Sequence, residues 1–250
     1  MPLVSADAPA IRMPVLTETL TAVWHLLFDL SEELPDNWCL IGGLMVGLYG
    51  VQYGRTGSRP TDDGDVLVDI RAEPSALRRI SGFLTARDLQ PDPAPEGILH
   101  RFKGVAGSGN ILIDVLAPDN VGPSADLTTT PGGRTIEVPG GTQALSRAED
   151  INVQVGDRTG RIPRPNLVGA ILIKLAALNL PGDSERHLQD LAFLLSAIPD
   201  PLGSRSTATR AERRKLGACA LTDRNHLAWN WLTDEDANAG HAALRLLADS

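Results

Sequence analysis

One aspartate inside an apolar segment places the strongest constraint on how this chain can fold. The segment NILIDVLAP, residues 110–118, has the β-branched and apolar content of a strand inside a sheet, yet Asp114 interrupts it. A carboxylate buried without a partner is costly, so it requires a cation or several hydrogen bonds. The alternative is an aspartate at a strand end that accepts hydrogen bonds from backbone amides. Apolar residues on both sides of Asp114 favour the first interpretation.

A second acidic segment, TDDGDVLVDI at residues 61–70, offers the partner that Asp114 needs. Alternate residues of a strand lie on one face, so Asp63 and Asp65 are expected to point the same way. Two carboxylates in one small volume repel each other unless a cation lies between them, and magnesium prefers oxygen ligands of this kind. The alternative is an exposed acidic turn, because Asp62 makes three aspartates in four residues.

A Gly-Gly pair marks a third feature. Gly42 and Gly43 follow the short apolar run WCLI and precede the small-residue segment GLMVGLYG, which indicates a strand, a tight turn and a helix. The first turn of such a helix exposes backbone N–H groups, an arrangement that receives phosphate. A Gly-Gly pair alone more often marks an ordinary turn. Its weight comes from the order of strand, Gly-Gly, helix, strand with paired aspartates, and later strand with a single aspartate.

The succession of apolar patterns predicts an α+β protein. Residues 1–13 are expected to form a flexible leader, and 14–160 mix strands with helices, including one further strand at 150–162. After Pro165 the spacing of apolar residues is helical throughout. We therefore expect a mixed sheet flanked by helices over 14–160 and a C-terminal helical domain over 161–250.

The charge balance limits the ligands that the surface can attract. A formal net charge of -8 argues against a protein coated in positive potential that binds long nucleic acid regardless of sequence. It leaves room for a local basic patch, for which the solvated face of a helix is the favoured alternative. The candidate residues are Arg205, Arg210, Arg213, Arg214 and Lys215.

The chain has no apolar stretch of the roughly 20 residues that a membrane span needs, and its first residues lack the layout of a secretion signal. We expect a cytoplasmic protein with no membrane partner. Cys39 and Cys219 lack the spacing of a zinc site, so reduced thiols are favoured over a single disulfide.

The segments LIGGLMVGLYG, RPTDDGDVLVDI and ILIDVL together resemble the nucleotidyltransferase superfamily that includes DNA polymerase beta. Within it, the chain looks most like bacterial AbiEii/AbiGii-type nucleotidyltransferases, whose best-known members are toxins of type IV toxin–antitoxin systems. The resemblance runs from about Trp38 to Ile198. It implies a nucleotidyltransferase-type mixed sheet followed by helices, and magnesium-dependent transfer from a nucleoside triphosphate.

The resemblance also implies a role for individual residues. Asp63, Asp65 and Asp114 match the metal-binding carboxylates, which would hold two magnesium ions. Lys174 and Asp190 match a helical lysine and a later aspartate that complete the catalytic site, and Arg186 matches a preceding basic residue. The nucleotide-binding residues implied in this way are Gly42, Gly43, Arg59, Thr61, Lys174 and Arg186.

Some residues depart from the family pattern or have simpler explanations. Gly64 stands where an apolar residue is usual, and Arg186 with His187 stands where Lys-Asp is common. Lys174 lies among apolar helix residues, so it would either meet an anion or extend to solvent. Arg186 and Asp190 are four residues apart, which also suits a surface ion pair.

The acceptor of the nucleotide is open at this stage. The resemblance to toxins favours RNA, such as a tRNA end, together with a cognate antitoxin protein as partner. The acidic net charge favours a small-molecule acceptor. A catalytically inactive module that binds a nucleotide or a protein is the third alternative, although retention of all three aspartates speaks against it.

Overall fold

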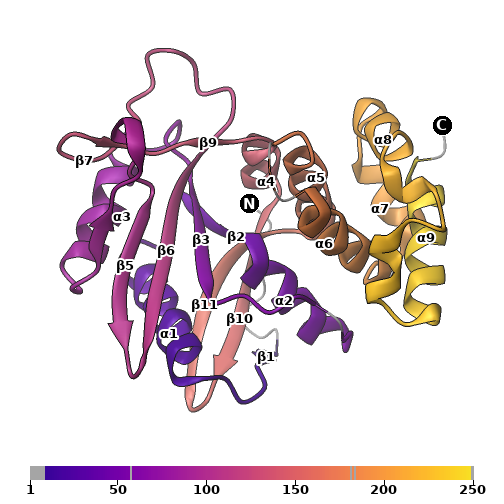
Figure 1. Ribbon diagram of the computed structural model, residues 1–250, viewed down its shortest axis with the longest axis horizontal. Helices are drawn as coiled ribbons and strands as arrows, with labels where there is room; N and C mark the ends of the chain where they lie inside the picture. The colour runs from indigo at the N-terminus through magenta and orange to yellow at the C-terminus, as the bar shows by residue number, and fades with distance from the viewer. Residues whose placement is uncertain (1–8, 57, 181, 183, 249–250) are drawn as a thin grey trace.

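A six-stranded mixed sheet forms the centre of the computed structural model, which describes residues 9–56, 58–180, 182 and 184–248. The strand order is β2-β3-β6-β5-β4, with β9 also pairing with β6. Strands β3 and β6 run parallel, whereas β2 is antiparallel to β3 and β5 is antiparallel to β6 (Figure 1). The predicted α+β class is confirmed. The strands are β2 (Trp38–Ile41), β3 (Asp63–Val68), β4 (Gln90–Asp92), β5 (Arg101–Ala106), β6 (Gly109–Pro118) and β9 (Glu137–Val138).

Helix α1 (Glu18–Glu33) covers one face of this sheet. It begins where the side chain of Thr17 accepts a hydrogen bond from the backbone N–H of Leu20, at 3.2 Å. A Cβ atom added at Gly64 on β3 would lie 3.5 Å from Val23 Cγ1 of α1. Because side chains alternate along a strand, the residues on either side of Gly64 face away from α1.

Other elements pack around the sheet. Helix α2 (Gly42–Tyr53) directly follows β2 and contacts β3. Helix α3 (Ala76–Thr85) lies beside the far end of the sheet, next to the small β7–β8 hairpin (Figure 1). The smaller elements are η1 (Pro95–Gly97), β7 (Thr128–Thr130), β8 (Gly133–Arg134) and α4 (Gly141–Ser146).

A second sheet of three strands differs from the single strand expected at 150–162. Strands β10 (Ala148–Val155) and β11 (Arg158–Pro165) form an antiparallel hairpin where one strand was expected, because Gly156 and Asp157 make a tight turn. β11 also continues through the predicted boundary at 160/161, and the first helix after it starts at Leu167. Within the predicted leader, Ile11–Arg12 pair with β10 as strand β1, while residues 1–8 lie outside the described residues.

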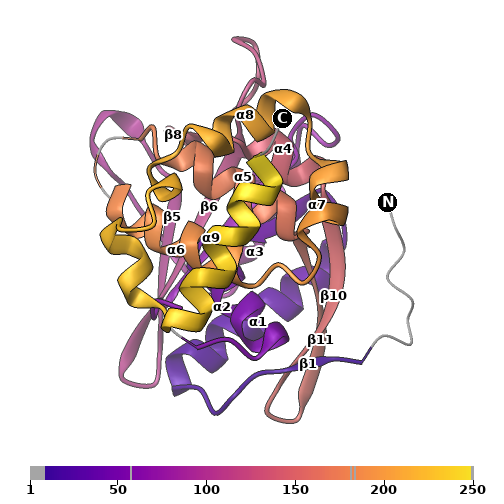
Figure 2. The ribbon, with the colours of Figure 1, turned by 90° about the vertical axis from the view of Figure 1, so that its right-hand side faces the viewer.

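The rest of the chain is helical, as predicted, and packs on itself and on α2. Helix α6 contacts α2, α5 and α9, so it joins the C-terminal helices to the sheet (Figures 1 and 2). Cys39 and Cys219 are both free and buried. No helix in the described ranges is long and apolar enough to cross a membrane. The elements are α5 (Leu167–Ala177), α6 (Ser184–Ser196), α7 (Pro201–Thr207), α8 (Arg210–Gly217), η2 (Ala220–Thr222), η3 (Leu227–Trp231) and α9 (Asp234–Ala248).

Candidate active site

The strand register brings the three predicted aspartates together. Asp65 on β3 lies directly opposite Asp114 on the neighbouring parallel strand β6. Asp63 is two residues before Asp65, so it shares the same face of β3. Since Gly64 faces α1, these carboxylates lie on the face of the sheet that α1 leaves uncovered.

The pKa values of Asp63 and Asp65 are raised, as expected for carboxylates that are buried close together. Burial, followed by the nearby charge of Asp114, raises the pKa of Asp65 to about 7, although Lys174 and Arg101 act in the opposite direction. Burial also raises the pKa of Asp63, with Arg101 opposing the shift and Asp114 adding to it. A bound cation would stabilise the ionised form of these carboxylates.

Arg101 is the functional residue that the sequence analysis missed. Its Nε and Nη2 atoms donate to Oδ1 and Oδ2 of Asp114, both at 2.8 Å, in a bidentate pair. Its Nη2 atom also lies 3.8 Å from Oδ2 of Asp63. A signal for it exists in the β5–β6 hairpin: a tight turn at 107–108 fixes a register in which Arg101 is opposite Asp114.

The three carboxylates are not a preformed metal centre. Among the described residues, no three His, Cys, Asp or Glu side chains are grouped so that they could hold a metal ion. Arg101 engages both oxygens of Asp114, which leaves Asp63 and Asp65 as the carboxylates without a bidentate partner. Magnesium in nucleotide sites is commonly held by one or two carboxylates together with phosphate oxygens of the substrate. Asp63 and Asp65, with their raised pKa values, fit that kind of ion.

The start of α2 faces the same cluster, and both glycines are required there. Gly42 has a φ of 71°, and a side chain at this position would overlap the carboxylate of Asp65. A Cβ atom at Gly43 would lie 2.7 Å from Cγ2 of Thr61. No side chain caps the first turn of α2, so its N–H groups and positive end are available to an anion.

The loop before β3 supplies a further positive charge. Arg59 lowers the pKa of Asp63, which places its guanidinium within electrostatic range of the cluster. Its Nη1 donates weakly to the backbone oxygen of Pro60, at 3.4 Å. Its Nε is buried and has no hydrogen-bond partner in the described part of the chain. Arg59 and Thr61 therefore lie close to Asp63 and Gly43, respectively.

Lys174 and Asp190 form a buried ion pair beside the cluster. Lys174 Nζ of α5 lies 2.7 Å from Asp190 Oδ2 of α6, and their side chains are only 7% and 4% exposed. Lys174 therefore does not extend to solvent. Asp190 is therefore buried against Lys174 and does not lie at the surface. Arg186 itself lies exposed, one helical turn before Asp190.

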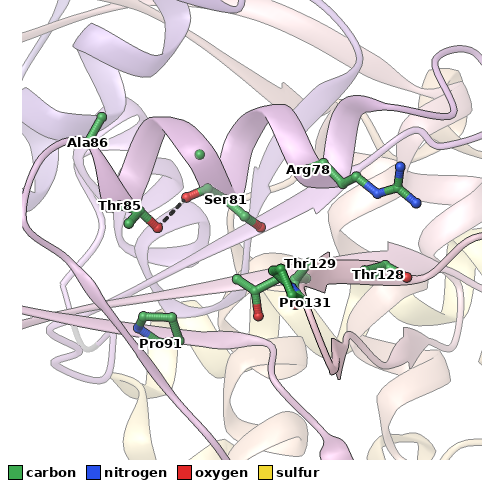
Figure 3. A pocket seen from close by; sticks show the side chains of 10 residues that line it. Arg78, Ser81, Thr85, Ala86, Pro91, Thr128, Thr129 and Pro131 are labelled. Carbon is green, nitrogen blue, oxygen red and sulfur yellow. Dashed lines mark hydrogen bonds between the residues drawn. The ribbon is translucent and has the colours of Figure 1, made fainter.

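A separate hollow lies on the other face of the sheet. A cavity of about 830 Å³ is lined by Arg78, Ser81 and Thr85 of α3, Pro91 of β4 and the threonines of β7 (Figure 3). Pro91 pairs with Phe102, and Phe102 pairs with Ile113, which shares the face of Gly64. The cavity is thus on the side of α1 and is separate from the aspartates.

No protein-family model and no curated protein matches the chain. It is similar to the solution structure of the antibiotic-resistance factor ANT(2'')-Ia, with a TM-score of 0.42 and 11% identity over 73% of this chain and 85% of that one. It is also similar to the crystal structure of an antigenic nucleotidyltransferase-like protein from Paracoccidioides brasiliensis, with a TM-score of 0.44 and 14% identity over 73% and 78% of the two chains. At this degree of likeness, function has to be inferred from the site itself.

Proposed function

We propose that this chain transfers a nucleotide from a nucleoside triphosphate to an acceptor hydroxyl, in a reaction that depends on magnesium. The observation that carries the proposal is the pairing of Asp63 and Asp65, whose pKa values are raised, with the uncapped start of α2 beside them. Carboxylates suit a divalent cation, and free N–H groups at a helix start suit phosphate. The two features on one face supply both halves of a metal-triphosphate site.

The residues have distinct tasks in this reaction. Asp63 and Asp65 would hold magnesium, two ions being expected from the resemblance, and Arg101 orients Asp114 next to them. The N–H groups of Gly42 and Gly43 receive phosphate oxygens, and the charges of Arg59 and Lys174 favour the triphosphate. When bound, magnesium stabilises the phosphate charge and lowers the pKa of the acceptor hydroxyl.

The covalent change is a single displacement. The acceptor oxygen forms a bond to the α-phosphorus while the bond from that phosphorus to the bridging oxygen of the β-phosphate breaks. Pyrophosphate leaves with the bonding electrons, and the proton of the hydroxyl passes to a carboxylate of the cluster. No redox change is involved.

The finer assignment follows from the sequence resemblance. We place the chain with the AbiEii/AbiGii-type enzymes, with RNA, such as a tRNA end, as acceptor and with a cognate antitoxin protein as partner. The buried pair of Lys174 and Asp190 supports this assignment, because both residues match positions of the family pattern and lie at the site.

The test is a transfer assay with nucleoside triphosphates labelled at the α-phosphate, magnesium and total RNA. We expect label in RNA with the wild type, none with Asp63→Asn, and wild-type transfer with Asp62→Asn, which removes an exposed neighbouring carboxylate. Transfer by Asp63→Asn at the wild-type rate would refute the proposal. Labelling of small hydroxyl compounds but not of RNA would show that the acceptor is a small molecule and not RNA, in keeping with the net charge of -8.

A further inference from the structure

Helix α8 concentrates positive charge in a chain that is acidic as a whole. Its eight residues include Arg210, Arg213, Arg214 and Lys215, whereas the formal net charge of the chain is -8. None of these four side chains takes part in an ion pair within the described structure. By contrast, Arg71, Arg78 and Arg79 each contact a carboxylate.

The one acidic residue of α8 is turned away from this surface. Glu212 is 7% exposed and accepts hydrogen bonds from the backbone N–H of Thr209 at 2.8 Å and from Nη2 of Arg147 at 3.1 Å. Leu216, one turn later, is buried on the same side. The inward face of α8 therefore takes the acid and the apolar residue, and the outward face is left with cations alone.

The arginines also line a hollow. A cavity of about 890 Å³ is bordered by Arg210, Arg213 and Arg214, together with Gly217 and Ala248. The Nε atom of Arg213 is shielded from solvent and has no hydrogen-bond partner among the described residues. A shielded donor without an acceptor is unfavourable, and an anionic oxygen in the hollow would satisfy it.

We infer that the outward face of α8 binds the phosphodiester backbone of an RNA acceptor; this rests on the proposed nucleotidyl transfer. Guanidinium groups suit phosphate because they donate two parallel hydrogen bonds and keep their charge. The patch is local, so it is compatible with an acidic protein that repels nucleic acid elsewhere.

The position of α8 favours a polymer over a small acceptor. Arg147 joins Glu212 of α8 to the first turn of α5, where a Cβ atom at Gly169 would lie 3.1 Å from Arg147 Cβ. Lys174 lies five residues further along α5, about 7.5 Å at the rise of an α-helix, and α8 adds its own width of about 10 Å. A ligand that contacts both the carboxylates and the outward face of α8 has to extend along α5 and across α8, as a nucleotide chain does. Figure 1 shows α8 on the outer side of α5, away from the sheet.

The test compares RNA binding by two matched triple variants. In Arg210→Gln/Arg213→Gln/Arg214→Gln the patch is neutralised, and in Arg71→Gln/Arg78→Gln/Arg79→Gln the same charge is removed from ion-paired arginines near and on α3. Binding of a fluorescent single-stranded RNA is followed by anisotropy between about 50 and 200 mM salt. We expect the α8 variant to bind about tenfold more weakly or worse, with a salt slope smaller by about 2, and the control to match wild type.

Other outcomes would overturn the inference. If both triple variants bind RNA equally weakly, the loss is a general effect of net charge. If polyglutamate displaces the fluorescent RNA as well as unlabelled RNA does, the ligand of α8 is an acidic protein. If circular dichroism shows that the α8 triple variant is unfolded, the double variant Arg210→Gln/Arg214→Gln, at two exposed positions, replaces it, with weaker binding and a salt slope smaller by about 1.4 as the expected result. Wild-type transfer to RNA by the α8 variant would refute this inference alone, whereas RNA binding that depends on α8 without transfer to any acceptor would refute only the proposed function.

Discussion

At the scale of single residues, the site is a balance between carboxylates and the cations placed against them. Asp114 is stabilised by the bidentate Arg101, and Asp190 by Lys174, but Asp65 has no ion pair of its own in the described structure. Its pKa is raised to about 7 because the ionised carboxylate is buried close to the charge of Asp114. An aspartate whose charge Lys174 and Arg101 compensate only in part points to a ligand that supplies positive charge.

The raised pKa of Asp65 predicts how stability changes with pH. Because the folded-state pKa lies above the unfolded value, its contribution to stability is fully present below about pH 4 and is lost as pH rises to about 7. Over this window the contribution amounts to at most about 4 kcal/mol, at about 1.4 kcal/mol per pH unit. In urea unfolding without divalent ions, Asp65→Asn should lack that loss between about pH 4 and 7. Wild type and Asp65→Asn with parallel pH profiles would contradict the assignment, and Asp62→Asn should follow wild type.

At the scale of elements, α2 and β3 are built around each other. The first turn of α2 approaches Asp65 so closely that residue 42 has no room for a Cβ atom, and its backbone adopts a conformation that favours glycine. Gly47, in the middle of the same helix, meets no atom within 4 Å of an added Cβ. The two glycines therefore serve different purposes.

Replacing each of these two glycines by alanine should distinguish an effect on the phosphate site from an effect on helix propensity. Gly42→Ala is expected to lower the unfolding free energy by more than about 1 kcal/mol and to abolish binding of a fluorescent nucleoside triphosphate, because Asp65 and the α2 start must move apart. Gly47→Ala should stabilise the protein by up to about 1 kcal/mol and leave binding unchanged. Unchanged nucleotide binding in Gly42→Ala would count against a phosphate site at this turn.

The elements that position the site could be predicted from the sequence because each has a strong local pattern. The apolar run of β6, the alternation in β3 and the Gly-Gly turn of α2 are legible without a structure. Strand β4, whose three residues are Gln90–Asp92, has no such pattern and was missed. Arg101 was missed because its contact with Asp114 is made across strands and depends on the register of the hairpin. Whether Lys174 meets an anion or extends to solvent depends on how α6 packs against α5, and residue spacing does not determine that packing.

At the scale of the whole molecule, the helical part completes the site from outside the sheet. Lys174 comes from α5 and Asp190 from α6, and α6 also packs against α9. The ion pair therefore joins α5 to α6, the helix that also contacts α2 and α9. The predicted division at 160/161 lies within β11.

The Lys174–Asp190 pair should behave as a buried pair in a double-mutant cycle. Lys174→Met or Asp190→Leu alone leaves an uncompensated buried charge and is expected to cost about 3–5 kcal/mol of unfolding free energy. The double variant should recover a large part of that loss. For comparison, breaking the exposed pair of Arg87 and Glu33 should cost about 1 kcal/mol or less. Additive losses in the Lys174–Asp190 cycle would contradict the pairing.

The central claim is that Asp63 and Asp65 bind a divalent ion together with a triphosphate at the start of α2. Electron paramagnetic resonance of Mn²⁺, titrated with wild type and with the Asp63→Asn/Asp65→Asn variant, tests it without any need for a known acceptor. We predict that wild type binds Mn²⁺, that a non-hydrolysable nucleoside triphosphate tightens this binding, that the double variant loses both effects, and that Asp62→Asn keeps them. Mn²⁺ binding of equal strength in wild type and the double variant, or a triphosphate effect that survives in it, would contradict the account.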